Sequence, residues 1–140
     1  MTNQPDSTAL RAMLIRHEGY RTHPYLDTVG KITIGVGRNL SDRGLSAAEI
    51  EFLLNTDIAI AIEDLSLYLP AWRGLPAEMQ LALISLSFNL GRKRLSGFKR
   101  LKKALQEKDR LGAAAELLDS KWADQVGKRA VHMAALLRGD

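Results

Sequence analysis

The sequence predicts an α+β fold in which a small, glycine-rich β lobe and a larger helical lobe flank a cleft and are joined by one long helix. Residues 24–40 mix β-forming residues with glycines, whereas from residue 46 onward apolar residues recur at helical spacing. The chain has 140 residues, 46% of them hydrophobic and 26% charged, which suits one soluble domain spanning residues 1–140.

A short helix over residues 8–18 is the first expected element. Leu10, Leu14 and Ile15 stand at helical spacing, and Gly19 is a suitable C-terminal stop. Glu18 then falls in the last turn, where a carboxylate is unfavourable against the helix dipole. A residue placed against a local preference is a mild indication of function, so Glu18 becomes a candidate functional residue.

The β lobe is expected over about residues 12–45. The sequence Asp-Thr-Val-Gly at 27–30 predicts a turn that leads into a strand over residues 31–36. Gly35 and Gly37 lie two residues apart, so one face of this strand carries almost no side chain. Such glycines often mark the close approach of a ligand or another backbone.

The rest of the chain is expected to be helical. Ser46-Ala-Ala-Glu49 is a capping box that begins a linking helix over residues 46–70, roughly 30–35 Å long. The helical lobe comprises residues 71–140 together with the N-terminal helix. Its first helix is expected to open at Pro76 and close at Gly91. Three shorter helices are expected near residues 98–107, 110–119 and 129–138.

Composition excludes several kinds of site. The chain has no cysteine, which excludes disulfides, thiolate catalysis and cysteine zinc sites. Its three histidines stand in distant segments, so a three-histidine metal site is not expected. The first eight residues lack the basic and apolar regions of a secretion signal, and no apolar run reaches ~18 residues. Neither a signal peptide nor stable membrane insertion is therefore expected.

Charge is distributed unevenly along the chain. Residues 1–90 carry 7 Lys and Arg against 10 Asp and Glu, whereas residues 91–140 carry 13 against 6. The segment from Arg92 to Lys103 holds seven basic residues and no acidic one. Such a patch favours a polyanionic partner, whether nucleic acid, anionic lipid or an acidic cell-wall polymer, but it also fits a solvated helix face.

Two carboxylates stand out as a possible catalytic pair. Cleavage of a glycosidic bond commonly uses one carboxyl group that protonates the leaving oxygen and a second that activates water or stabilises charge on the sugar. Glu18 at a helix end and Asp27 beside a turn could lie on opposite walls of one cleft, and the hydroxyl of Thr33 could hold a water. Acidic pairs nine residues apart are common, so this spacing alone is weak.

A longer string of residues resembles the motif of the phage-type lysozymes. Its parts are Glu18-Gly-Tyr20, Tyr25-Leu-Asp27-Thr28, Gly30 and Thr33-Ile-Gly-Val-Gly37. The resemblance covers nearly the whole chain, because it continues through Ser87-Phe-Asn-Leu-Gly91, Ser96-Gly-Phe98, Trp122 and Gly127-Lys-Arg-Ala130.

The resemblance implies a role for each matching residue. Glu18 matches the general acid, and Asp27 with Thr33 matches the pair that positions and activates water, with inversion at the anomeric carbon. Arg129 matches the arginine that pairs with the catalytic glutamate. Phe88 matches a cleft aromatic that contacts sugar, although a packed core aromatic is an equally good interpretation. Asn39 occupies a cleft position at which the T-even phage enzyme has leucine, so its contact with sugar is an open expectation.

One position departs from the family pattern. The residue after Gly37 is a histidine in the T-even phage enzyme but Arg38 here, and Asp57 stands where the acidic partner of that histidine would be. The sequence therefore predicts an Arg38–Asp57 ion pair. Because arginine keeps its charge to high pH, such a pair would persist in alkali.

The resemblance implies an endolysin, free of metal and cofactor, that hydrolyses the β-1,4 bond between N-acetylmuramic acid and N-acetylglucosamine in peptidoglycan. A monomer is expected, because a small enzyme of this kind must penetrate a mesh. Nucleic acid is then not the expected partner. The enzyme would accumulate in the host cytoplasm and reach the periplasm and cell wall through a holin-type pore. The alternatives are a non-catalytic cell-wall-binding module, membrane disruption by basic helices such as Leu95–Leu105, and a lytic transglycosylase, which needs no catalytic water.

Overall fold

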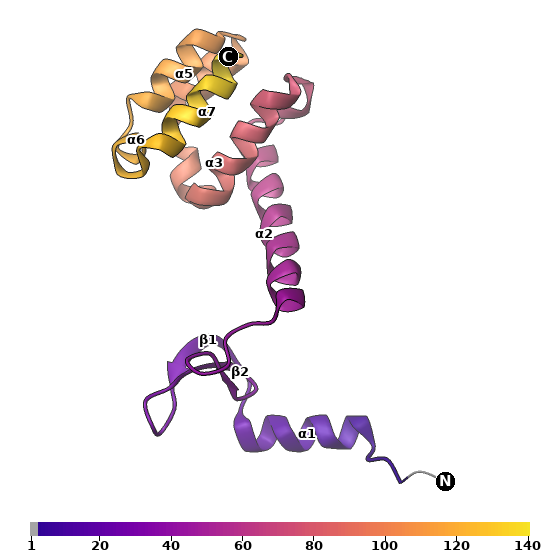
Figure 1. Ribbon diagram of the computed structural model, residues 1–140. Coiled ribbons are helices and arrows are strands. Elements are labelled where there is room, and N and C mark those ends of the chain that lie inside the picture. Colours follow the sequence, from indigo (N-terminus) through magenta and orange to yellow (C-terminus); the bar gives the residue numbers. More distant parts are fainter. Residues whose placement is uncertain (1–2) are drawn as a thin grey trace. The chain divides into compact units, whose positions relative to one another are not determined.

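The computed structural model describes residues 3–140 and confirms the α+β class (Figure 1). The chain divides into two compact units, residues 1–51 and residues 52–140. The first holds an N-terminal helix and a three-stranded antiparallel sheet, and the second is helical. The division falls within α2 (Ala47–Tyr68), the long helix expected over residues 46–70.

Helix α1 (Ser7–Glu18) begins and ends at local signals. The carboxylate of Asp6 caps its first turn by accepting a hydrogen bond of 3.0 Å from the backbone N–H of Thr8. Gly19 ends the helix with φ +86°, and its N–H donates to the carbonyl of Ile15 at 2.8 Å. The predicted helix and stop are thereby confirmed, and Glu18 is the last helical residue.

The sheet consists of β1 (Arg21–Leu26), β2 (Ile32–Gly35) and β3 (Arg38–Asn39), in that order. Strand β1 pairs with β2 so that Tyr25 lies opposite Thr33. The register shifts between Arg21 and Tyr25, where Pro24 cannot donate a hydrogen bond to the ladder. The short strand β3 was not expected from the sequence, and it makes Gly37 part of a turn rather than of a strand.

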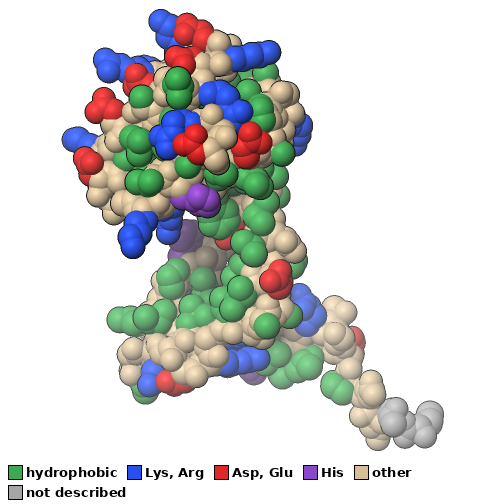
Figure 2. Space-filling model, turned by 45° about the horizontal axis from the view of Figure 1, so that its top comes forward, with side chains coloured by type: hydrophobic (Ala, Val, Ile, Leu, Met, Phe, Trp, Pro, Cys, Tyr) green, Lys and Arg blue, Asp and Glu red, His purple; other side chains and the backbone are tan. Residues whose placement is uncertain are grey.

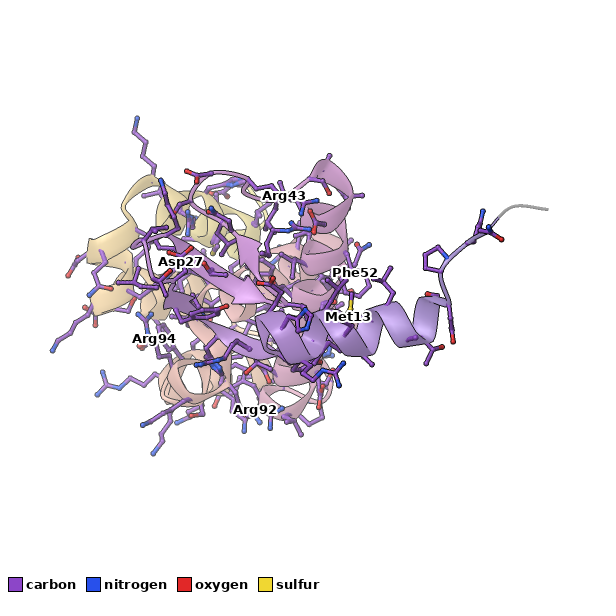
Figure 3. The ribbon with its side chains drawn as sticks, turned by 90° about the horizontal axis from the view of Figure 1, so that it is seen from below. Met13, Asp27, Arg43, Phe52, Arg92 and Arg94 are labelled. Carbon is purple, nitrogen blue, oxygen red and sulfur yellow. The ribbon has the colours of Figure 1, made fainter. Side chains whose placement is uncertain are left out.

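Apolar side chains of the first unit remain accessible. Leu10, Met13, Leu14 and Ile15 on α1 are 36–41% exposed. Figure 2 shows hydrophobic side chains at the surface of this unit, and Met13 is labelled on α1 in Figure 3. Among the described residues of this unit, Thr33 alone is buried. The unit is therefore organised less by an apolar core than by the hydrogen bonds of its sheet and turns.

The capping box at the start of α2 is confirmed. The hydroxyl of Ser46 accepts from the N–H of Glu49 at 3.2 Å, and the carboxylate of Glu49 accepts from the N–H of Ser46 at 2.8 Å. The same carboxylate binds both terminal nitrogens of Arg38, with Nη1–Oε1 at 2.8 Å and Nη2–Oε2 at 2.6 Å. Such a two-point pair is geometrically specific.

The predicted Arg38–Asp57 ion pair is therefore wrong. The guanidinium of Arg38 donates to the carboxylate of Glu49 and, through Nη1, to the carbonyl of Gly44 at 3.2 Å. Asp57 lies eight residues beyond Glu49, about 12 Å further along the helix. The arginine lies in β3 and meets the first turn of α2, so the nearer carboxylate captures it.

The second unit contains a 3-10 turn (Trp72–Gly74) and the helices α3 (Ala77–Ser96), α4 (Lys99–Gln106), α5 (Arg110–Leu118), α6 (Lys121–Val126) and α7 (Lys128–Arg138). The expected end at Gly91 appears as a kink, because this residue has φ +78° and ψ +170° within α3. Helix α6 was not expected. It has only six residues, too few for a periodic pattern, and begins where the hydroxyl of Ser120 caps the N–H of Ala123.

The core of the second unit consists of leucine, alanine and tryptophan side chains from α2, the 3-10 turn and α3 to α7, together with Tyr68, Met79 and Met133. Arg110 on α5 links the end of α7 to the start of α3. Its guanidinium donates to the carbonyls of Leu136 and Leu137, at 3.1 and 2.8 Å, and to the carboxylate of Glu78 at 2.9 Å. The last turn of α7 is thereby attached to the first turn of α3.

No helix within residues 3–140 combines the length and the apolar character that crossing a membrane requires.

We predict an acid-dependent contribution of the Arg38–Glu49 pair to stability. The hydrogen bond from Arg38, followed by the backbone hydrogen bond from Ser46, lowers the pKa of Glu49 from 4.5 to about 2. Because the folded pKa is the lower one, the stabilisation is complete above pH 4.5 and is lost as the pH falls toward 2. The stability advantage of the wild type over Glu49→Gln, measured by denaturant unfolding, should shrink across this window.

Glu51→Gln is the matched control, because Glu51 is exposed and forms no ion pair among the described residues. Its stability difference from the wild type should change little over the same window. An advantage over Glu49→Gln that persists unchanged at pH 2 would contradict the assignment.

Candidate functional site

Glu18 is held against a glycine of the sheet. It is exposed at the end of α1, and Gly37 in the turn between β2 and β3 lies beside its side chain. A Cβ atom placed on Gly37 would lie 2.8 Å from Oε2 of Glu18 and 3.2 Å from its Cβ. The glycines were expected to mark the approach of a ligand or another backbone, but the group that lies close to Gly37 is the side chain of the candidate acid, and a Cβ on Gly35 would meet nothing within 4 Å.

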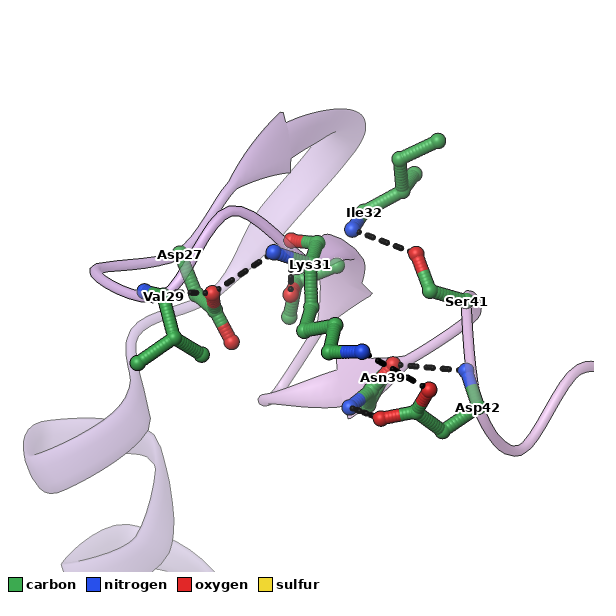
Figure 4. A network of polar contacts seen from close by, with 8 residues as sticks. Asp27, Val29, Lys31, Ile32, Asn39, Ser41 and Asp42 are labelled. Atoms are coloured by element: carbon green, nitrogen blue, oxygen red, sulfur yellow. Dashed lines mark hydrogen bonds and ion pairs between the residues drawn. The ribbon is translucent and has the colours of Figure 1, made fainter.

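Asp27 closes the turn between β1 and β2 (Figure 4). One carboxylate oxygen, Oδ1, accepts from the backbone N–H of Val29 at 3.0 Å and of Lys31 at 2.8 Å. The N–H of Asp27 donates to the carbonyl of Lys31, and the N–H of Gly30 donates to the carbonyl of Asp27. Among the described residues, Oδ2 makes no hydrogen bond, so this half-buried carboxylate keeps one oxygen for chemistry.

Thr33 is joined to Asp27 through one peptide group. Its hydroxyl donates to the carbonyl of Lys31 at 3.0 Å, the same carbonyl that accepts from the N–H of Asp27. The Thr33 side chain is only 4% exposed and lies opposite Tyr25 in the ladder. Since the hydroxyl proton is engaged, the remaining capacity of Oγ1 is to accept a hydrogen bond.

The side chain of Asn39 hydrogen-bonds to Asp42 in the loop that follows β3. Its amide nitrogen donates to Oδ2 of Asp42 at 3.0 Å, and its amide oxygen accepts from the N–H of Asp42 at 3.0 Å. Lys31 adds an ion pair of 3.1 Å to the same carboxylate. The amide thus folds the loop after β3, and its expected contact with sugar stays a prediction.

Two further candidates belong to the second unit. Phe88 on α3 is 47% exposed, so the interpretation of it as a packed core residue is wrong, and it lines a pocket of about 160 Å³ with Asp57 and Ser87. Arg129 is exposed near the start of α7 and forms no ion pair within its own unit. The Glu18–Arg129 pair expected from the family stays a prediction.

The tryptophans are structural. Trp72 and Trp122 are each 3% exposed, and their indole N–H groups donate to the hydroxyl of Ser66 and the amide oxygen of Asn89, respectively. Neither ring offers a face on which sugar could stack. The partnership of Asn89 with Trp122 carried no signal in the sequence, because the two residues stand 33 positions apart.

The arrangement supplies the parts of acid–base chemistry. Glu18 offers an exposed carboxyl group, Asp27 a carboxylate with one uncommitted oxygen, and Thr33 an oxygen that accepts hydrogen bonds. Asp27 and Thr33 are both hydrogen-bonded to the backbone of Lys31. Within residues 3–140, His, Asp and Glu side chains form no cluster of three that could hold a metal ion.

Comparison with known proteins gives a family for this arrangement. The family model described as phage lysozyme matches residues 15–138, a span that includes every candidate site residue. A Dictyostelium discoideum protein named "Probable T4-type lysozyme 2" is 28% identical, with 87% of this chain and 89% of that protein covered. The chain belongs to the phage lysozyme family, a family of glycoside hydrolases that act on peptidoglycan.

Proposed function

We propose that this protein is an endolysin that cleaves the β-1,4 bond between N-acetylmuramic acid and N-acetylglucosamine with inversion. The observation that carries this proposal is the hydrogen bonding of Asp27 and Thr33 to the backbone of one residue, Lys31. Its N–H donates to Oδ1 of Asp27, and its carbonyl accepts from the hydroxyl of Thr33. A carboxylate and a hydroxyl so fixed can hold one water molecule between them. Hydrolysis needs such a water, whereas a transglycosylase does not.

Glu18 is the general acid of this proposal. Its protonated carboxyl group delivers a proton to the glycosidic oxygen as the bond from that oxygen to the anomeric carbon breaks. The contact with Gly37 limits the positions that the carboxyl group can occupy, because atoms of Glu18 fill the space of the missing side chain. Arg129 is proposed to orient the same carboxyl group, and Phe88 to contact the sugar.

Asp27 and Thr33 handle the water. The water donates one hydrogen bond to Oγ1 of Thr33, whose own proton is held by the Lys31 carbonyl, and the other to Oδ2 of Asp27. As the water oxygen bonds to the anomeric carbon, its proton passes to Asp27. Attack on the face opposite the leaving oxygen inverts the configuration.

The biological setting is also part of the proposal. A peptidoglycan hydrolase made in the host cytoplasm would need a route to its substrate, and a holin-type pore made by the phage would supply it. The enzyme is proposed to act there as a monomer, without a cofactor.

Membrane disruption by the basic helices is the weaker alternative. That activity requires an apolar helix face that can enter the bilayer. Leu95, Leu101 and Leu105 are each at most 2% exposed, because they form part of the core of the second unit. The folded protein therefore offers no such face at this segment.

The first prediction concerns the products. Purified peptidoglycan digested by the wild type should give hydrated reducing-end muropeptides by mass spectrometry, and Glu18→Gln should release them at a rate lower by about 10²–10⁴-fold. Proton NMR early in the digestion of a glycan oligomer should show the α anomer first. Anhydro products would instead identify a transglycosylase, and no wild-type cleavage would favour a non-catalytic wall-binding module.

The second prediction separates the two roles of Asp27. Asp27→Asn keeps an acceptor for the N–H groups of Val29 and Lys31, so its free energy of unfolding should stay near that of the wild type, while activity falls by about 10²–10⁴-fold. Asp27→Ala loses the acceptor as well and should be destabilised by about 1–3 kcal/mol. Denaturant unfolding and turnover of the same preparations test both. Full activity in Asp27→Asn would remove this residue from the mechanism.

The third prediction uses two glycines that have nearly the same positive φ. Gly35 and Gly37 have φ of +68° and +67°, but only at Gly37 would a Cβ meet another group within 4 Å. Alanine at either position should cost roughly 1–2 kcal/mol of stability from the left-handed backbone. Only Gly37→Ala should also displace Glu18 and reduce kcat by about 10²-fold or more. Equal losses of kcat in both variants would show that backbone strain, not the contact, is responsible.

A further inference from the structure

Positive charge without partners accumulates at the end of α3 and on α4. The segment from Arg92 to Lys103 carries seven basic side chains. Among the residues that the structure describes, only Arg92 of these seven forms an ion pair. Arg92 and Arg94 project from the surface of this unit in Figure 3. Unpaired like charges repel one another, so this surface favours an anionic partner.

A groove of about 410 Å³ lies within this charged region, between α2, α3 and α4. Leu67 and Tyr68 of α2 line it together with Lys99 and Lys102 of α4. Lys102 lies over the ring of Tyr68, with Nζ 5.8 Å from the ring centroid. The tyrosine hydroxyl is committed to the carbonyl of Phe98, so the wall formed by α2 is fixed to the start of α4.

The one carboxylate that lines the groove is already neutralised. Asp64 is buried, and its Oδ1 accepts from Nε of Arg92 at 2.8 Å. Glu63 lies 3.7 Å from the same guanidinium. Arg92 therefore balances its acidic neighbours, and Lys99 and Lys102 supply the net positive charge of the groove. Lys103 adds charge one helical turn beyond Lys99, whereas Arg100 lines a separate pocket with Glu116 and Asp119.

We propose that this groove, the α4 groove, binds a phosphodiester-linked polymer of the bacterial cell wall. Lysine ammonium groups bind phosphate oxygens as point charges, and Lys99 and Lys102 stand one turn apart on one side of the groove. A linear polyanion can engage both in succession and run on toward Lys103. Such binding holds the enzyme beside its substrate, a benefit that rests on the proposed function, although the binding itself does not need catalysis.

Two other polyanionic surfaces fit less well. An anionic bilayer would gain only surface attraction, because the apolar face of α4 is buried. Single-stranded nucleic acid is usually held by exposed aromatic side chains on which bases stack. The aromatic residue of the groove, Tyr68, is 7% exposed. A polymer without bases needs no such platform.

The test measures binding of the full chain to poly(glycerol phosphate) by isothermal titration calorimetry at 50 mM and 200 mM salt. The probe carries no glycan to cleave, so a failed cleavage assay and a failed binding assay report on separate proposals. The variant Lys99→Gln with Lys102→Gln should bind about tenfold or more weakly and depend less on salt. The matched control, Lys108→Gln with Lys121→Gln, removes the same charge from exposed positions of the same unit and should stay within about twofold of the wild type.

A second measurement does not depend on the variants folding. Amide chemical shifts of the wild type, recorded during titration with the same polymer, should move over residues 96–103 and at Tyr68 and stay constant over α6 and α7. Equal weakening in the control pair, or shifts spread over the whole basic surface, would show diffuse attraction and overturn the proposal. Tighter binding to single-stranded DNA of equal charge, or to vesicles of anionic phospholipid, would overturn the choice of partner.

Discussion

The first unit depends on one carboxylate oxygen. Oδ1 of Asp27 accepts the N–H groups of Val29 and Lys31, which closes the turn and sets the register that places Thr33 opposite Tyr25. Thr33 is the one buried residue among those described in this unit, and its hydroxyl donates to the Lys31 carbonyl, which also accepts from the N–H of Asp27. The turn and the proposed water site are therefore one structure. A small sheet with little apolar burial thus gains its order from polar contacts, and those contacts also prepare the chemistry.

A second set of contacts constrains the surroundings of Glu18. Glu49 caps α2 and forms an ion pair with Arg38, the residue that directly follows Gly37. The backbone at Gly37 is thereby tied to the start of a 22-residue helix. The position of the candidate acid is consequently defined by a hydrogen-bonded cap, a two-point ion pair and a missing side chain. None of these three contacts is itself catalytic.

The sequence predicted what short-range chemistry determines. Gly19, the Ser46–Glu49 box and the turn at Asp27 act over a few residues, so the ends of α1, the start of α2 and the hairpin could be foreseen. The partner of Arg38 could not, because it depends on where a strand meets a helix in space. Strand β3 and helix α6 were too short to carry a periodic signal. The family motif supplied Glu18, Asp27 and Thr33, whereas spacing alone would have left them among many acidic pairs.

The attachment of α7 by Arg110 bears on how the protein is made. Ala134 and Leu137 of this helix are at most 1% exposed, so the core of the helical unit lacks one wall until they arrive. During synthesis on the ribosome, α3 emerges about fifty residues before α7. Arg110, whose guanidinium binds the carbonyls of Leu136 and Leu137 in the folded protein, emerges between these two helices. During that interval the nascent chain exposes the apolar surface that α7 later covers. This surface is a binding site for chaperones until synthesis is complete.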